Sequence, residues 1–492
     1  ARMQQLGADD GSFLQQALSV LPSADGPHID QLFLLFVAYL LLLGPIGYLV
    51  LKRLDKREWA WITIPLLALV FTISAYALGV TLKGSDVLIR ELGVVRSASG
   101  GDRGLADVAV GIISPRRATY DVEVPGGALL SELDNGGDRA REDILLGEHG
   151  GLRGLEVGVG TVRGFRVQTV VETPRIDTDL TIAGDRLQGT VTNASDRPLE
   201  QVSLVYGGAM ARLGDLAPGA TVPVDMPTST AARGISLATR MFKGATADTD
   251  DGKRALLTRL AIIRAISGGW GWNADMVTDP LGTKGPVVLA WTSGGILGAT
   301  VGESSRTTGE TLYVTPVRVG AQGEVTFSDS TLLSSGAQMD AAEGWIDEVG
   351  TINLGQGTMT ARYRPAGLDG SLAVSELALR LDAGHRPMTG QASTASFLTE
   401  DEQPDQADPV RTGPQPSPGT DVASGVPRVQ LLELATGRWL ELEPLRRGST
   451  YRVPDPERFV DPSGAFSVRL VNRERATVDT FVFDARLTGT AS

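Results

Sequence analysis

Two long apolar runs, Leu32–Leu51 and Trp59–Val80, lie almost back to back near the start of the chain, and neither contains a charged residue. At 1.5 Å per residue, each run predicts a helix of roughly 30 Å, the thickness of the hydrocarbon core of a bilayer. The pattern therefore predicts a transmembrane helical hairpin over residues 29–82 in a multi-pass protein of the cell membrane.

The short connection between the two runs carries four basic residues, Lys52, Arg53, Lys56 and Arg57. Short loops rich in Lys and Arg stay on the cytoplasmic side of a membrane. We therefore expect a cytoplasmic connection, with both termini extracytoplasmic.

An alternative for the first run is a cleaved signal peptide. The run is too long for that, it follows some thirty mixed residues, and a second spanning run comes directly after it. Residues 1–28 are interpreted as an extracytoplasmic segment, and the end of a preceding domain is the alternative.

Glycine and proline interrupt both predicted helices, at Gly44, Pro45 and Gly47 in the first and at Pro65 in the second. A proline removes one helical hydrogen bond and kinks the helix. The plain interpretation is a kinked anchor, and the alternative is a packing site for other membrane subunits. An ion path is not expected, because neither run contains an ionisable residue.

After the hairpin the pattern changes to short β-branched runs separated by turn residues, which predicts a mainly β protein of tandem sandwich domains. The expected divisions are a β domain at 83–176, an immunoglobulin-like sandwich at 177–230, a helix with a β extension at 231–322, and a jelly-roll-like domain at 323–492. Residues 392–427, rich in Pro, Ser, Thr, Gln and Asp, are predicted to form a disordered insert.

Two of these segments have a specific internal pattern. In the immunoglobulin-like segment, alternation predicts a core of Leu187, Val191, Leu204 and Leu216. Between Gly252 and Ser267 the helical period predicts an amphipathic helix. Its apolar stripe contains Leu256, Leu257, Leu260, Ile263 and Ile266, and the remainder is assigned to Lys253, Arg254, Arg259 and Arg264.

Composition narrows the chemistry. The chain has no cysteine, which excludes disulfides, thiol catalysis and thiolate metal sites. Its formal charge of −13 argues against a nucleic acid partner and against broad adhesion to anionic lipid. Expected partners are the lipid bilayer and other envelope or membrane proteins, with polysaccharide as an alternative.

Four tryptophans are candidates for a ligand or interface surface: Trp270, Trp272, Trp291 and Trp439. In a glycine-rich loop, Trp270 and Trp272 suit a sugar-stacking platform or a lipid interface. The alternative is that they cover the β core.

The sequence contains no catalytic signature. The three histidines lack metal-ligand spacing, and the glycine-rich segment 294–302 lacks the lysine of a phosphate loop, so a loop or tight packing is expected there. Carboxylate pairs such as Glu441/Glu443 suit a glycosidase only weakly in so acidic a chain. Residues 134–138 and the sequon at Asn193 are interpreted as turns. No catalytic residue, cofactor or metal is predicted.

The order of several short segments resembles an uncharacterised family of bacterial membrane-anchored exported β-sandwich proteins. The resemblance is carried by Leu43–Tyr48, Gly189–Asn193, Leu213–Gly219, Gly437–Trp439 and Asp461–Gly464. It implies a cell-envelope location, alongside transport machinery, and no catalytic residue.

Three functions follow as hypotheses. The first is a non-enzymatic envelope scaffold or accessory subunit, anchored by the hairpin and presenting β domains for protein contacts, for example to an export or transport complex. The second is a membrane-tethered carbohydrate-binding protein. The third, an extracytoplasmic hydrolase, requires two carboxylates in one cleft with perturbed pKa values.

Overall fold

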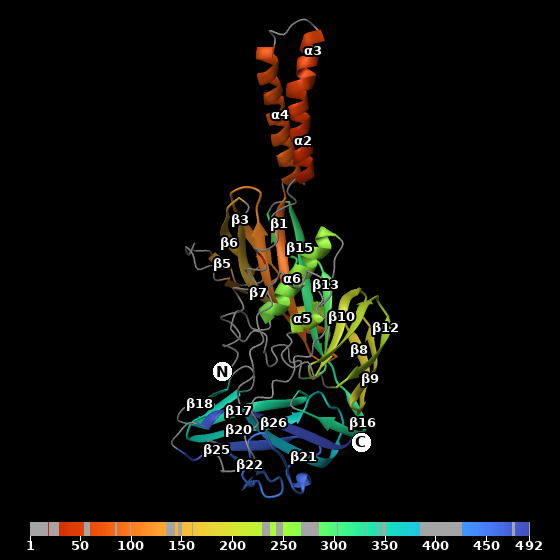
Figure 1. Ribbon diagram of the computed structural model, residues 1–492, viewed down its shortest axis with the longest axis vertical. Coiled ribbons are helices and arrows are strands. Elements are labelled where there is room, and N and C mark those ends of the chain that lie inside the picture. The colour runs from red at the N-terminus through yellow and green to blue at the C-terminus, as the bar shows by residue number, and fades with distance from the viewer. Residues whose placement is uncertain are drawn as a thin grey trace.

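The computed structural model shows a mainly β protein with a helical hairpin at one end (Figure 1). The residues that it describes are 18, 29–53, 60–83, 86–98, 100–133, 143–145, 150–159, 161–228, 237–242, 249–266, 285–302, 304–328, 330–341, 344–346, 351–383, 426–474 and 478–491. Trp270, Trp272 and the predicted insert 392–427, apart from Val426 and Pro427 at its end, lie outside these residues.

The apolar runs form two helical arms lying side by side. The first arm consists of α2 (Ile29–Leu41), the π-helical turn η1 (Leu42–Ile46) and α3 (Gly47–Arg53), and the second is α4 (Ala60–Lys83). The rings of Tyr39 and Phe71 meet across the arms, with centroids 5.1 Å apart. Within the described residues, one stretch, Phe36–Arg53, is apolar and long enough to span a membrane, and Ile64–Ser74 is a shorter apolar helix.

The predicted interruptions fall where the helical geometry changes in the first arm. Gly44 and Pro45 lie in the π-helical turn, and Gly47 begins α3, while Pro65 lies inside α4. A Cβ atom added at Gly44 would meet nothing within 4 Å. Gly44 therefore does not serve to pack the two arms together.

The largest sheet of the hairpin-proximal region has eight strands in the order β11-β10-β13-β15-β1-β2-β7-β4. The parallel pair β1 and β15 lies at its centre. The bounds are β1 (Val87–Ser97), β2 (Arg103–Ile113), β4 (Leu129–Glu132), β7 (Val162–Glu172), β10 (Leu199–Tyr206), β11 (Ala209–Leu216), β13 (Val287–Ser293) and β15 (Ser305–Pro316).

Each face of this sheet is covered. On one face lies a four-stranded sheet of β14 (Thr300–Val301), β3 (Ala118–Val124), β6 (Gly150–Val157) and β5 (Asp143–Leu145). On the other lie α5 (Leu237–Phe242) and α6 (Asp250–Ile266), as Figure 1 shows. Two separate apolar clusters result, one on each side of the sheet.

The hairpin-distal sheets form a second sandwich. The nine-stranded sheet has β12 (Thr221–Pro227), β9 (Arg186–Asn193), β8 (Ile176–Gly184), β16 (Gly320–Phe327), β26 (Val478–Ala491), β19 (Thr351–Leu354), β18 (Gly344–Ile346), β21 (Leu372–Ala383) and β24 (Thr450–Arg452). The five-stranded sheet has β17 (Leu332–Ala341), β20 (Gly357–Pro365), β25 (Phe466–Asn472), β22 (Arg428–Leu432) and β23 (Trp439–Glu441), and a short 3-10 helix, η4, covers Pro456–Arg458.

Sheets run across the divisions expected from sequence. Strands β10 and β11 of the segment 177–230 belong to the eight-stranded sheet, whereas β8, β9 and β12 join β16 and β26. The predicted core positions of this segment, Leu187, Val191, Leu204 and Leu216, are all buried. The segment is thus a sandwich whose two sheets both continue into its neighbours.

One residue before the hairpin is packed into the β sandwich. Leu18 is fully buried against the face that α6 also covers. Gly111 and Gly164 are paired between β2 and β7 and leave room for it. A Cβ atom at Gly111 would lie 3.0 Å from Leu18 Cδ2, and one at Gly164 would lie 3.1 Å from Cδ1. Residues on both sides of the hairpin therefore pack together on the eight-stranded sheet.

We expect Leu18→Ala to lower the free energy of unfolding by about 2–5 kcal/mol, because it leaves a cavity over two glycines that cannot fill it. The measurement is urea unfolding of the full chain in detergent, monitored by tryptophan fluorescence. The control is Leu105→Ala on β2, where the leucine is 49% exposed and the cost should stay within about 0.5 kcal/mol. Equal effects of the two changes would contradict the packing of Leu18.

Candidate functional site

The predicted surface tryptophans are not brought together within the described residues. Trp291, on β13, is fully buried under α6, so it is not available to stack on a sugar, and its assignment to a ligand surface is corrected. Trp439, on β23, is half-buried on the outer face of the five-stranded sheet, and the guanidinium of Arg469 lies over its ring at 4.0 Å. One face of that ring is therefore already occupied.

Two of the four basic residues that set the predicted topology, Lys52 and Arg53, lie at the tip of the hairpin. Lys52 and Arg53 are exposed in the last turn of α3, and Lys56 and Arg57 lie outside the described residues. Cations in a last helical turn also interact favourably with the helix dipole.

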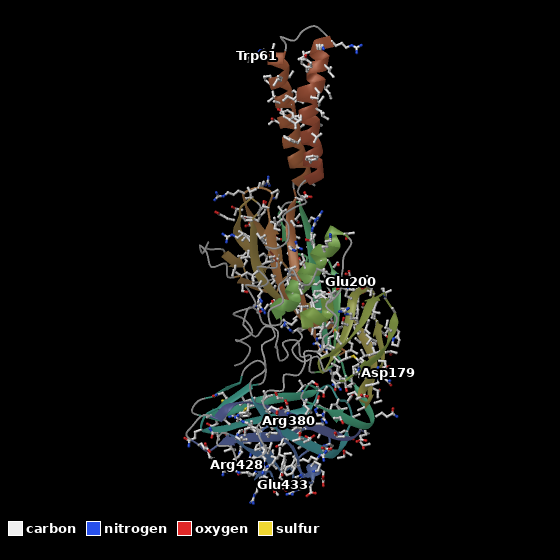
Figure 2. All side chains as sticks on the ribbon, in the orientation of Figure 1. Trp61, Asp179, Glu200, Arg380, Arg428 and Glu433 are labelled. Atoms are coloured by element: carbon white, nitrogen blue, oxygen red, sulfur yellow. The ribbon has the colours of Figure 1, made fainter. Side chains whose placement is uncertain are left out.

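A group of charged side chains, the α6 charge cluster, joins helix α6 to the eight-stranded sheet. Its members are Arg259 from α6, Arg90 from β1, Glu310 from β15, Glu200 from β10 and Ser293 from β13. Figure 2 labels Glu200, beside the helix. Strand pairing brings these residues together, because Ser293 is in register with Glu310, and Glu200 with the neighbouring Trp291.

Arg259 is the centre of the cluster. Its Nε donates to Glu310 Oε2 at 2.8 Å, and one terminal nitrogen donates to Glu200 and, at 3.3 Å, to Ser293 Oγ. Ser293 Oγ in turn donates to Glu200 Oε1 at 3.0 Å. The guanidinium also lies 5.4 Å from the centroid of Trp291.

The prediction that Arg259 lies on the polar face of α6 is wrong, because its side chain is buried with the apolar stripe. The helical period explains the position, because residue 259 is three residues after Leu256 and four before Ile263, on the same face. The expectation that the Arg259 side chain faces solvent rested on its charge alone. Its buried charge is compensated by two carboxylates rather than by water.

The pKa values of the two carboxylates, Glu310 and Glu200, are shifted in opposite directions. Burial raises the pKa of Glu310, and Arg259 only partly offsets it. Burial acts the same way on Glu200, but there the hydrogen bonds and charge of Arg259 prevail and lower the pKa. Burial also lowers the pKa of Arg90, to about 10, which still leaves this arginine charged at neutral pH.

Two carboxylates with pKa values shifted apart are typical of an acid–base pair. Here both bind the same guanidinium, which fills the space between them. Acid–base chemistry on a substrate would require Arg259 to leave its buried position, at a large desolvation cost. The geometry therefore favours a structural role, in which the cluster fixes α6 on the sheet.

A second buried carboxylate explains the glycine-rich segment 294–302. Glu91 Oε2 accepts hydrogen bonds from the backbone N–H groups of Ile296 at 2.6 Å and Leu297 at 2.9 Å, and Oε1 accepts one from Ala299 at 3.3 Å. A Cβ atom at Gly295 would lie 2.7 Å from this carboxylate. Successive N–H groups of this kind form an anion site, and here the anion is a side chain of the same protein.

The sequon at Asn193 and the segment Asp461–Gly464 are turns, and residues 134–138 lie outside the described residues. Asn193 is buried, donates to the carbonyls of Arg197 and Leu216 at 2.9 Å each, and accepts from Ser195, so its amide nitrogen is not accessible for glycosylation. Asp461 Oδ1 accepts from the backbone N–H groups of Ser463 and Ala465 and closes the turn at 461–465. Among the described residues, no three metal-ligating side chains cluster.

We expect Arg259→Met to lower the free energy of unfolding by about 3–5 kcal/mol near pH 7, because Glu310 is left buried and charged without its partner. A raised pKa in the folded state makes stability fall as pH rises through that pKa, so the cost should be smaller near about pH 5. Urea unfolding at the two pH values measures this.

The matched control is Arg259→Met/Glu310→Gln, which removes the buried charge as well. It should recover much of the stability and lose the pH dependence. A double variant no more stable than Arg259→Met would show that packing of the arginine, rather than its charge, holds α6.

Comparison with known proteins identifies one segment. Residues 175–320 match a domain family described as a domain of unknown function, DUF8725, and this range contains the whole immunoglobulin-like segment, α5, α6 and strands β13 to β15. No curated protein sequence matches the chain.

Solved structures give low similarity. The yeast δ-COP-I μ-homology domain, in complex with a Dsl1 WxWxV peptide, is 7% identical with a TM-score of 0.25, over 47% of this chain and 96% of that one. A chaperone–tip adhesin complex of CFA/I fimbriae is 8% identical with a TM-score of 0.12, over 82% and 84% of the two chains. At these TM-scores neither likeness carries an argument about fold or function.

Proposed function

We propose that the chain is a non-enzymatic, membrane-anchored scaffold or accessory subunit of a cell envelope. Two transmembrane helices anchor it, and its β sheets make extracytoplasmic contacts with other envelope proteins. The observation that carries the proposal is the exposed apolar surface of the hairpin, which extends from Phe33 to Leu49 on the first arm and from Trp61 to Ile73 on the second. The loop between the helices lies on the cytoplasmic side.

Most of the large exposed apolar side chains of the described residues belong to the hairpin. They are Phe33, Phe36, Leu40, Leu41, Leu42, Ile46, Tyr48, Leu49, Trp61, Ile62, Ile64, Leu66, Leu69, Val70 and Ile73. Contiguous apolar surface of this kind is rare in water and marks a membrane or protein interface. It supports a lipid environment for both arms.

The polar groups of the second arm suit the same environment. Thr72 and Ser74 donate their hydroxyls to the carbonyls of Ala68 and Val70, one turn back in α4, at 2.8 Å each. Side-chain hydroxyls in lipid need such internal partners. Trp61 is 88% exposed near the start of α4, at the tip of the hairpin (Figure 2), where an aromatic side chain suits the membrane–water interface.

Leu18 supports two crossings rather than one. It is buried in the same sheet as β1, which begins at Val87, just after α4. A single crossing would place these two residues on opposite sides of the membrane. An even number of crossings lets both flanks fold into one β sandwich.

The absence of cysteine allows a direct test of topology with single-cysteine variants. In intact cells, a membrane-impermeant maleimide should label Glu324→Cys on the exposed surface of β16 and should label Lys52→Cys only after permeabilisation. Resistance of the protein to carbonate extraction is the accompanying control. Labelling in the reverse order would contradict the proposed orientation, and extraction by carbonate would contradict the anchor.

The accessory-subunit part has its own test. Tagged full chain purified from native membranes in mild detergent should carry a membrane protein in stoichiometric amount. The matched control is an unrelated two-helix membrane protein at the same expression level. Recovery of the chain as a single species, with or without polysaccharide, would contradict this part of the proposal.

A further inference from the structure

The end of the β sandwich that faces the hairpin is defined by strand register. α4 ends at Lys83 and β1 begins at Val87, so the two lie within about 15 Å along the chain. In the sheet, Leu88 pairs with Ile113, Ile113 with Val162, and Val87 with Ser305. The segments 114–117, 159–163 and 304–306 therefore gather at this end, which Figure 1 shows beneath the hairpin.

Four arginines belong to these segments: Arg116, Arg117, Arg163 and Arg306. Arg116, Arg117 and Arg306 are exposed, and Arg163 is half-buried. We call them the basic rim. Their sign is opposite to that of the chain, whose formal charge is −13.

Two acidic side chains, Glu156 and Asp86, lie near the rim. Glu156 lies 3.9 Å from Arg117, and both side chains are more than 60% exposed, which makes the ion pair weak. Asp86 accepts a hydrogen bond from Ser304 Oγ at 2.9 Å. Glu303 belongs to the same loop and lies outside the described residues.

Hydrogen bonds from the buried Ser114 hold the turn that carries Arg116 and Arg117. Ser114 is buried, and its hydroxyl donates to the carbonyl of Arg116 and accepts from the N–H of the same residue. Ser114 Oγ also lies 2.7 Å from Tyr120 Oη. Beside this turn, Val159 is 58% exposed, and its backbone pairs with that of Ser114. The rim is thus a rigid basic surface with an apolar tip.

We propose that the basic rim binds the headgroups of anionic phospholipids and seats the β sandwich on the membrane surface. The proposal rests on the membrane anchoring proposed above, which holds this end near the headgroup layer. Arginines next to an anionic membrane surface are attracted to it electrostatically, and the attraction falls off within a Debye length. This proposal refines the expectation that the acidic chain does not adhere broadly to anionic lipid, because only its basic end faces the membrane.

The test uses the full chain with the single change Val159→Cys, labelled with an environment-sensitive fluorophore and reconstituted into vesicles. The vesicles contain phosphatidylcholine alone or an equal mixture with phosphatidylglycerol. We expect the anionic mixture to shield the probe from the neutral quencher acrylamide, and high salt to reverse the shielding. Neutralising one arginine should weaken headgroup association about fivefold.

The rim variant carries Arg→Gln at positions 116, 117, 163 and 306, and should lose the shielding. The matched control removes the same charge from the hairpin-distal sheets, with Arg→Gln at 380, 428, 452 and 473, and should keep it; Figure 2 labels Arg380 and Arg428 there.

Three other outcomes overturn the proposal. Quenching that is equal in the two lipids, in a protein that resists carbonate extraction, overturns the rim and leaves the anchor. Equal loss of shielding in both variants shows a general charge effect and also overturns the rim. A chain that does not float with either vesicle overturns the anchor and the rim together.

Discussion

The structure depends on strand β1 being buried on both faces. This strand starts just after the hairpin and lies between β2 and β15 at the centre of the eight-stranded sheet. Val87 and Ile89 face the sandwich core, whereas Leu92 and Val94 face α6. The same strand carries Arg90 toward the helix and Glu91 toward the loop 294–302. The strand that follows the hairpin is therefore the one around which both apolar clusters and both buried charge sites form. This couples the fold of the β sandwich to the position of the hairpin.

Charge is used in two ways in this chain. Where it is buried, it is matched, as for Arg259 with Glu310 and Glu200, or for Glu91 with three backbone N–H groups. A matched buried pair contributes little net stability but makes any other position of α6 costly, since separating the partners leaves an unpaired charge. At the surface the pairs are mostly exposed and weak, such as Arg117 with Glu156. Specific geometry is therefore set by the buried charges, and the surface charges are left to determine which partners approach.

The sequence was sufficient where a period and residue type agreed. Leu187 and Val191 alternate with polar residues, and both are buried as predicted. The sequence was insufficient where the type of a residue and its position in the pattern indicated different environments. Trp291 resembles a ligand residue in isolation, yet the unbroken apolar run 287–291 is typical of a strand covered on both faces, and that signal places it inside. Arg259 lies on the apolar stripe by period but not by type. Nothing in the sequence indicated where Leu18 packs, because its pocket exists only when Gly111 and Gly164 pair across two strands. Sheet membership was equally beyond reach, since β9 and β10 are consecutive in sequence but belong to different sheets.

The connections between sheets hold the hairpin-distal sheets in a fixed position relative to the eight-stranded sheet. β15 lies parallel to β1, ends at Pro316, and is followed after three residues by β16, which pairs with β26 of the distal sandwich. The short link is itself bonded, with Val319 N–H donating to the carbonyl of Gly367 at 3.0 Å. Gly367 has a φ of +71°, and a Cβ atom there would lie 2.5 Å from Pro286, so the junction tolerates no side chain. A chain of paired strands therefore runs from the end of the hairpin to the distal sheets without a flexible linker along this path. Because bending this path would break backbone hydrogen bonds, the position of the hairpin end of the sandwich fixes the position of the nine-stranded sheet.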